Sequence, residues 1–129
     1  MRKSLVLTLA AISLCLGLVL GLALPLIAQQ EKGLYLTVRR YEGVTDPREA
    51  GRRVNEGFIP LISQIPGFVA YYWVDAGGGV MVSTSVFESQ AAAEESNLKA
   101  RGWVQQNIAS MLPNPPQITA GSVVAHKVK

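Results

Sequence analysis

GFVAYYWVDAGGGVMVSTSVF, residues 67–87, contains two runs rich in β-branched and aromatic residues, separated by three glycines. In the first run Val69, Tyr71 and Trp73 alternate with the residues expected on the opposite face. Alternation at period two on both sides of a glycine turn predicts a β-hairpin. The glycines at 77–79 permit the positive φ angles of a tight turn. Because the hairpin carries aromatic rings and a row of hydroxyls, we expect it to form part of any pocket.

A strand and a helix are expected before the hairpin. Residues 34–41 (LYLTVRRY) alternate in the manner of a strand. Asp46 can cap a helix, Pro47 suits its first position, and Glu49 stands where a capping box requires it. Pro60 should kink or end this helix, because its ring meets the carbonyl four residues back. The inner face is expected to consist of residues at four-residue spacing: Ala50, Val54, Phe58 and Ile62.

A second helix and a last strand are expected after the hairpin. Ser89 can cap the helix, and the prolines within residues 113–116 must end it. Residues 117–127 (QITAGSVVAHK) indicate the last strand. The inner helix face is expected to consist of Ala93, Asn97, Ala100, Val104, Ile108 and Met111.

The predicted order is therefore strand, helix, strand, strand, helix, strand. An α+β, ferredoxin-like βαββαβ fold accommodates this order, with a four-stranded antiparallel sheet and two helices on one face. The other face of the sheet still carries apolar residues. Covering it with the same face of a second copy predicts a homodimer.

The N-terminal segment differs in character from the rest. Arg2 and Lys3 precede a run, residues 4–30, that contains no charged residue. This pattern is typical of a secretory signal peptide or of an uncleaved membrane anchor. Ala28 would suit cleavage and Leu26 would not, so both alternatives stay open for residues 1–30. Either one places a domain at residues 34–128 outside the cytoplasm, secreted or periplasmic, or held at the membrane by the N-terminal segment.

Charge and cysteine content exclude several classes of function. Arg2 and Lys3 supply two of the three net positive charges, so the remainder lacks the clustered basic face of a nucleic-acid-binding protein. The one cysteine, Cys15, lies in the apolar N-terminal run, which leaves the domain without a disulfide or a thiolate metal site. The one histidine, His126, cannot form a metal cluster alone. No metal site is expected.

The segment Tyr35–Lys127 resembles the antibiotic-biosynthesis-monooxygenase-like superfamily of dimeric α+β barrels. The resemblance rests on residues 65–68 (IPGF) before the second strand, and on residues 82–87 followed by an Ala/Glu-rich helix with Trp103. It implies a homodimer and a cofactor-independent monooxygenase of a small aromatic or quinol compound. In such enzymes the deprotonated substrate reacts with oxygen, and Asn, Trp, Tyr and Arg side chains take part.

By residue type and expected location, the resemblance implies two sets of site residues. The catalytic set is Asn97, Tyr72 and Trp73. The substrate-binding set is Tyr71, Arg39 and Trp103. The aromatic residues could equally pack in the core or at the dimer interface. Asn97 interrupts an apolar helix face, so its amide is either bonded to backbone or presented to a cavity.

Two hypotheses for the function remain. Haem degradation is disfavoured, because the iron-binding histidine of the haem-degrading relatives would lie on the second helix, which contains none. The domain is therefore either an oxygenase or a non-catalytic module that binds an apolar ligand or serves as a structural homodimer. A continuous pocket that touches Asn97 and a tyrosine would favour the oxygenase.

A reporter fusion tests the predicted export. Residues 1–33 fused to a reporter that is active only in the periplasm should give an active reporter, because the charge-free run directs the chain across the membrane. A reporter that stays entirely in the cytoplasm would contradict the prediction.

Overall fold

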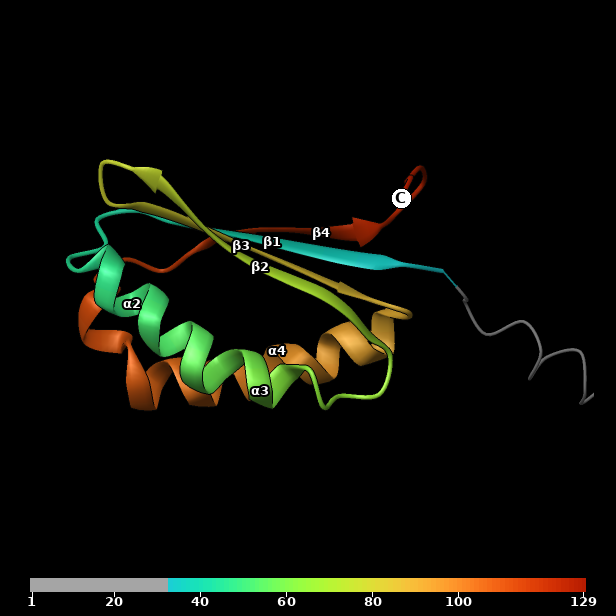
Figure 1. Ribbon diagram of the computed structural model, residues 1–129, viewed down its shortest axis with the longest axis horizontal. Coiled ribbons are helices and arrows are strands. Elements are labelled where there is room, and N and C mark those ends of the chain that lie inside the picture. The colour runs from blue at the N-terminus through green and yellow to red at the C-terminus, as the bar shows by residue number, and fades with distance from the viewer. Residues whose placement is uncertain (1–32) are drawn as a thin grey trace, which may run out of the picture. The chain divides into compact units, whose positions relative to one another are not determined.

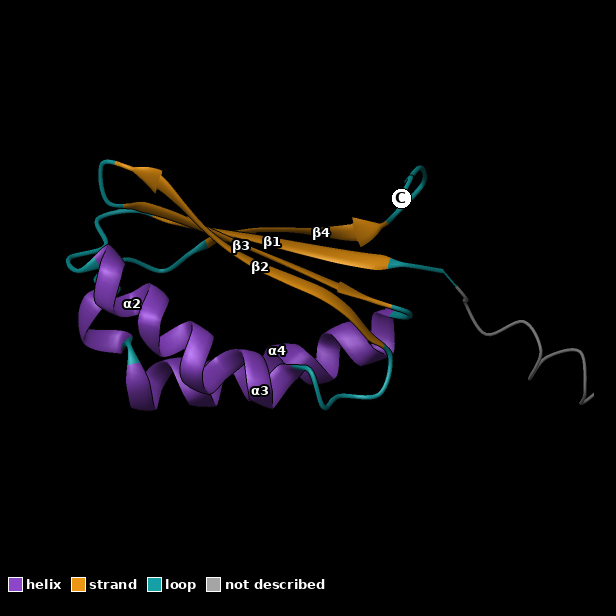
Figure 2. Ribbon diagram, viewed as in Figure 1, coloured by secondary structure: helices purple, strands orange, loops and turns teal. Residues whose placement is uncertain are grey.

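The computed structural model describes residues 33–129, which form a four-stranded antiparallel sheet in the order β2-β3-β1-β4. Figure 1 and Figure 2 show the helices of this segment on one face of the sheet. The predicted ferredoxin-like βαββαβ fold is confirmed. In chain order the elements are β1 (Tyr35–Tyr41), α2 (Pro47–Arg53), the π turn η1 (Val54–Phe58), α3 (Ile59–Ile62), β2 (Phe68–Gly77), β3 (Val80–Phe87), α4 (Gln90–Asn107), the 3-10 turn η2 (Ala109–Met111) and β4 (Gln117–Ser122).

The signal peptide or anchor predicted at residues 1–30 lies outside the described residues. Within residues 33–129, no helix combines the length and the apolar character needed to cross a bilayer.

Strands β2 and β3 form the predicted hairpin, and the three glycines at the turn have φ angles of 84°, 62° and 78°. A bulge in β2 changes the expected alternation. Phe68 pairs with Phe87 and Ala70 with Val86, so one extra residue lies between the two pairs. Phe68 and Tyr71 therefore both face the helices, whereas strict alternation placed them on opposite faces.

The first helix continues through Pro60 instead of ending there. Its predicted inner face is confirmed, because Ala50, Val54, Phe58 and Ile62 are all buried. Before the proline the helix widens into η1, where the N–H of Ile59 donates to the carbonyl of Val54, five residues back. This wider turn lies where the proline ring would otherwise meet the carbonyl of the residue four positions earlier.

Helix α4 begins as predicted and packs closely against the first helix. The Ser89 hydroxyl accepts a hydrogen bond from the N–H of Ala92 at 3.1 Å. A Cβ atom at Gly57 would lie 3.2 Å from the indole of Trp103, so the absence of a side chain at Gly57 lets the two helices approach.

The last strand is shorter than predicted. β4 ends at Ser122, whereas the sequence predicted a strand as far as Lys127. Its partner β1 starts at Tyr35, and past Ser122 the N–H of Val123 still bonds to the carbonyl of Leu34 at 2.8 Å. Further on, the register offers no strand residue to pair with, and Val124 is 98% exposed.

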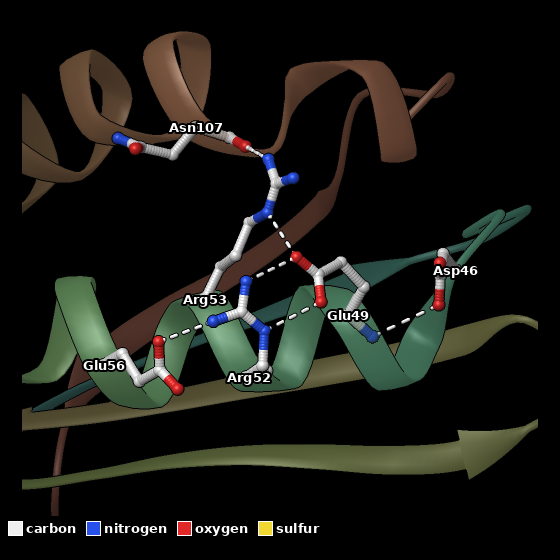
Figure 3. A network of polar contacts seen from close by, with 6 residues as sticks. All are labelled: Asp46, Glu49, Arg52, Arg53, Glu56 and Asn107. Carbon is white, nitrogen blue, oxygen red and sulfur yellow. Dashed lines mark hydrogen bonds and ion pairs between the residues drawn. The ribbon is translucent and has the colours of Figure 1, made fainter.

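A polar network connects α2 to the end of α4 (Figure 3). The Glu49 carboxylate accepts hydrogen bonds from Arg52, at 2.7 and 2.8 Å, and from Arg53, at 2.8 Å. Arg53 also donates to the carbonyl of Asn107 at 2.5 Å. A cation suits this position, because carbonyl groups at the C-terminus of a helix carry partial negative charge. The network thus links the C-terminal end of α4 to α2.

Replacing Glu49 by Gln should weaken the pH dependence of stability between pH 5 and pH 2. Hydrogen bonds from Arg52 and Arg53 lower the pKa of Glu49 from 4.5 to about 2. Because the pKa is depressed in the folded state, the stabilisation is fully present above pH 4.5 and is lost as the pH falls through 2. Urea unfolding of the wild type should therefore lose more stability over this range than unfolding of Glu49→Gln.

The control is Glu88→Gln, which changes an exposed glutamate in the loop before α4. It should follow the wild-type pH dependence. Equal pH dependence of the wild type and Glu49→Gln would show that the network does not stabilise the fold.

Candidate active site between α4 and the sheet

A cavity of about 340 Å³ lies between α4 and the helix-side faces of β1 and β4, and β4 is exposed along its whole length. We call it the Asn97 cavity. Most of its wall is apolar, and two guanidinium groups contribute the positive charge. It is lined by Thr37, Arg39 and Tyr41 from β1, by Asn97, Ala100, Arg101, Val104 and Gln105 from α4, and by Pro116, Ile118 and Ala120 from the C-terminal segment.

Arg39 and Asn97 meet at the wall of this cavity. Alternation along β1 directs Arg39 toward the helices, on the same face as Thr37 and Tyr41. Its Nη2 atom donates a hydrogen bond to Oδ1 of Asn97, and both residues are half-buried. The amide oxygen of Asn97 is therefore bonded to a side chain that lines the cavity, and the amide is presented to that cavity.

The charge of Arg39 is not neutralised by a carboxylate. Among the described residues no ion pair includes Arg39, and no Asp, Glu or His lines the Asn97 cavity. Arg52 and Arg53, in contrast, both pair with Glu49. A half-buried cation with a neutral partner exerts a stronger field than one in water. The cavity is therefore suited to a negatively charged or acidic group.

A smaller void of about 20 Å³ adjoins the Asn97 cavity and shares Arg39 and Tyr41 with it. Its wall is largely aromatic. The ring centroids of Tyr41 and Trp73 are 5.7 Å apart, and Phe58 lies 5.2 Å from Tyr71 and 5.3 Å from Trp103. These rings pack against one another around the void that Arg39 also lines.

The two tyrosines near Arg39 retain their hydroxyl protons at neutral pH. Burial raises the pKa of Tyr41 and of Tyr71, and the positive charge of Arg39 only partly offsets that effect. Tyr71 also shares a hydrogen bond with Ser83. Tyr41 lines the cavity, so its protonated hydroxyl can donate a hydrogen bond to an anion there.

Some polar atoms near the cavity have no hydrogen-bond partner among the described residues. They include the hydroxyl of Thr37, which is 1% exposed and lines the Asn97 cavity, and the indole N–H of Trp73, which lines the smaller void. An unpaired buried polar group costs about 1–3 kcal/mol. The hydroxyl of Thr37 can therefore gain stability by bonding to a polar ligand in the Asn97 cavity.

The structure brings together five of the six residues predicted for the site. Arg39 and Asn97 line the Asn97 cavity, and Tyr71, Trp73 and Trp103 line the smaller void. Tyr72 is separate from them. It lies on the uncovered face of the sheet, with 60% of its surface exposed, because consecutive strand residues point to opposite faces.

The lining residues that were not predicted for the site include three whose side chains can bond to a ligand: Thr37, Tyr41 and Arg101. Thr37 and Tyr41 could have been found, because they share a face of the first strand with Arg39. Arg101 could also have been found, because it follows Asn97 by one helical turn. Within residues 33–129, no group of three His, Cys, Asp or Glu side chains is placed to hold a metal ion.

Comparison with known proteins identifies relatives in fold. Neither a family model nor a curated protein matches the sequence. A candidate antibiotic biosynthesis monooxygenase from Nitrosomonas europaea superposes with a TM-score of 0.61 at 14% identity, over 73% of this chain and 93% of that one. The Rv0793 protein of Mycobacterium tuberculosis gives a TM-score of 0.60 at 19% identity, over 74% and 100%.

A third solved structure contains a ligand. It is the ActVA-Orf6 monooxygenase of Streptomyces coelicolor in complex with nanaomycin D, with a TM-score of 0.59 at 16% identity, over 76% of this chain and 93% of that one. At such identities the likeness concerns the fold. The chain therefore shares the ferredoxin-like α+β fold of these solved structures, which is the fold that the resemblance in its sequence implied.

Proposed function

We propose that the domain binds a small phenolic or quinol compound in the Asn97 cavity and oxygenates it without a cofactor. The observation that carries this proposal is the Arg39–Asn97 pair, a half-buried cation with a neutral partner in a largely apolar cavity. Such a site favours the anionic form of a bound phenol over the neutral form. The apolar side chains in its wall can contact the aromatic ring.

The chemistry that we propose requires only the substrate and dioxygen. Arg39 stabilises the phenolate, and the hydroxyls of Thr37 and Tyr41 can donate hydrogen bonds to its oxygen. Negative charge spreads to the carbons ortho and para to that oxygen, and one of these that carries a hydrogen (the para carbon of 1-naphthol, an ortho carbon of a quinol) forms a bond with dioxygen. The resulting hydroperoxide loses water and gives a quinone. One oxygen atom thus enters the product, the other leaves in water, and the four electrons come from the substrate.

A relative of the same fold supports the choice of ligand. The Streptomyces coelicolor monooxygenase was solved with nanaomycin D. Ligand binding without oxygenation is the second candidate function. It is favoured by one observation, that no described Asp, Glu or His lines the cavity to take the phenol proton. In the first proposal that proton leaves to solvent, because the field of Arg39 lowers the pKa of the bound phenol.

We further propose that the domain acts outside the cytoplasm. The charge-free run at residues 4–30 supports this location. A chain that stays anchored at a membrane would be close to membrane quinols, whose head groups belong to the proposed substrate class.

A homodimer is the assembly that we propose. The face of the sheet without helices presents mostly apolar side chains, and large hydrophobic residues of β2 are exposed on it, including Tyr72 and Val74. Leu36 and Val86 form a cross-strand pair on the same face. A continuous apolar face of this kind is typical of an interface, and a second copy supplies the same surface in return.

Replacing Asn97 by Asp tests the proposed site. The variant gives Arg39 a carboxylate partner of nearly unchanged shape, so its thermal midpoint should equal or exceed that of the wild type. Binding of 1-naphthol should weaken about tenfold or more, because a hydrogen bond to a charged group is worth about 1.5–3 kcal/mol. Thermal shift with 1-naphthol, and oxygen uptake coupled to 1,4-naphthoquinone formation, measure the two effects.

The matched control is Asn55→Asp, the same change at an exposed position of η1. It should bind 1-naphthol like the wild type. Unchanged 1-naphthol binding in Asn97→Asp would contradict the proposed site. Wild-type binding without oxygen uptake would reject the oxygenase in favour of ligand binding alone.

The dimer is tested by placing a charge on the uncovered sheet face. Light scattering of residues 31–129 at micromolar concentration should give a dimer for the wild type and a monomer for Val86→Glu, because a buried unpaired carboxylate is costly at an interface. The control Gln106→Glu, on the exposed side of α4, should remain dimeric. A monomeric wild type would contradict the proposed assembly.

A further inference from the structure

Two arginines line the Asn97 cavity, and the proposed oxygenation uses only one of them. Arg39 lies on β1 and holds Asn97. Arg101 lines the same cavity from α4, one helical turn after Asn97, and is itself exposed. Because side chains four residues apart share a helix face, Asn97 and Arg101 stand in one row along the wall. Arg101 therefore occupies the rim, and Arg39 lies deeper.

The local sequence leaves Arg101 without an acidic neighbour. The positions three and four residues away on the helix are Leu98, Val104, Asn97 and Gln105, none of which is acidic. In contrast, Lys99 on the same helix has Glu95 four residues earlier, and the two form an ion pair at 3.8 Å. Among the described residues no ion pair includes Arg101.

Apolar side chains form a large part of the wall that Arg39 and Arg101 share. Ala100 and Val104 supply them from α4, and Ile118 and Ala120 supply them from β4. A ligand that satisfies both cations must therefore have an apolar body with an acidic group at each end. One neutral quinol head group would leave Arg101 without a partner.

We infer that the ligand of the Asn97 cavity is an apolar hydroxy acid, whose phenolic end meets Arg39 and whose carboxylate is bound by Arg101 at the rim. This inference rests on the proposed function, since it names the substrate class of the same site. It assigns Arg101 a role in selecting substrates, and it distinguishes aromatic acids from uncharged quinols. Oxygenation at the phenolic end leaves the carboxylate unchanged.

Two matched probes test the carboxylate. 5-Hydroxy-1-naphthoate carries its carboxylate on the ring opposite the phenol, and 5-hydroxy-1-naphthamide has the same shape without the charge. The wild-type full-length chain in nonionic detergent should bind the carboxylate roughly fivefold more tightly than the amide, the upper range for an exposed ion pair. This preference should shrink as ionic strength rises. Because every variant is titrated in the same detergent, partitioning of the probes affects all of them alike.

Arg101→Gln should abolish the preference for the carboxylate, because binding of the carboxylate should weaken more than binding of the amide. The control is Arg48→Gln, which removes an exposed charge from α2 and should keep the preference. Equal binding of both probes by the wild type, or a preference that survives in Arg101→Gln, would overturn the inference.

The same titrations separate the inference from the proposed function. Suppose that the amide and 1-naphthol bind, that their binding weakens in Asn97→Asp, and that the carboxylate binds no more tightly than the amide. The proposed function then stands, and the role of Arg101 is wrong. If no probe binds the wild type, both are contradicted.

Discussion

Arg39 imposes the constraint on which the site depends, because it places a cation on the covered face of a central strand. The pleat of β1 directs Arg39 toward the helices together with Thr37 and Tyr41. A charge in that position needs a hydrogen-bond acceptor, and α4 supplies the amide of Asn97. A neutral acceptor satisfies the geometry of the guanidinium without cancelling its charge. The positive charge in the cavity is therefore available to an anionic ligand. The position of α4 matters to this site because it supplies Asn97.

Much of the fold could be predicted from local sequence, because its signals are short-range. The glycines at 77–79 and the alternation around them predicted the hairpin, and Asp46 and Ser89 both cap the helices that they were expected to start. The errors arose where tertiary pairing overrides a local pattern. The bulge after Phe68 is fixed by pairing with β3 and leaves no clear trace in an alternating sequence. The end of β4 likewise depends on where β1 begins.

The types of residue in the site could be predicted from the sequence, whereas the contacts between them were harder to predict. Asn97 stood out because an amide interrupts an apolar helix face. Its partner Arg39 is 58 positions away in the chain, and the contact depends on α4 crossing the sheet beside β1. Alternation alone could not tell whether Tyr71 or Tyr72 faces the helices. Packing of Phe58 against Tyr71 identifies Tyr71 as the inner residue. Arg101 was missed because an exposed helical arginine is usually solvated, although its spacing of one helical turn from Asn97 was a signal for it.

The ionisation of bound 1-naphthol tests the central claim most directly. Naphthol and naphtholate absorb at different wavelengths, so a pH titration of the complex gives the pKa of the bound phenol. If the charge of Arg39 is available in the cavity, the bound phenol should ionise at a lower pH than in water, and the shift should vanish in Asn97→Asp. A bound phenol whose pKa is unchanged or raised would show that burial outweighs the cation, and would contradict the account.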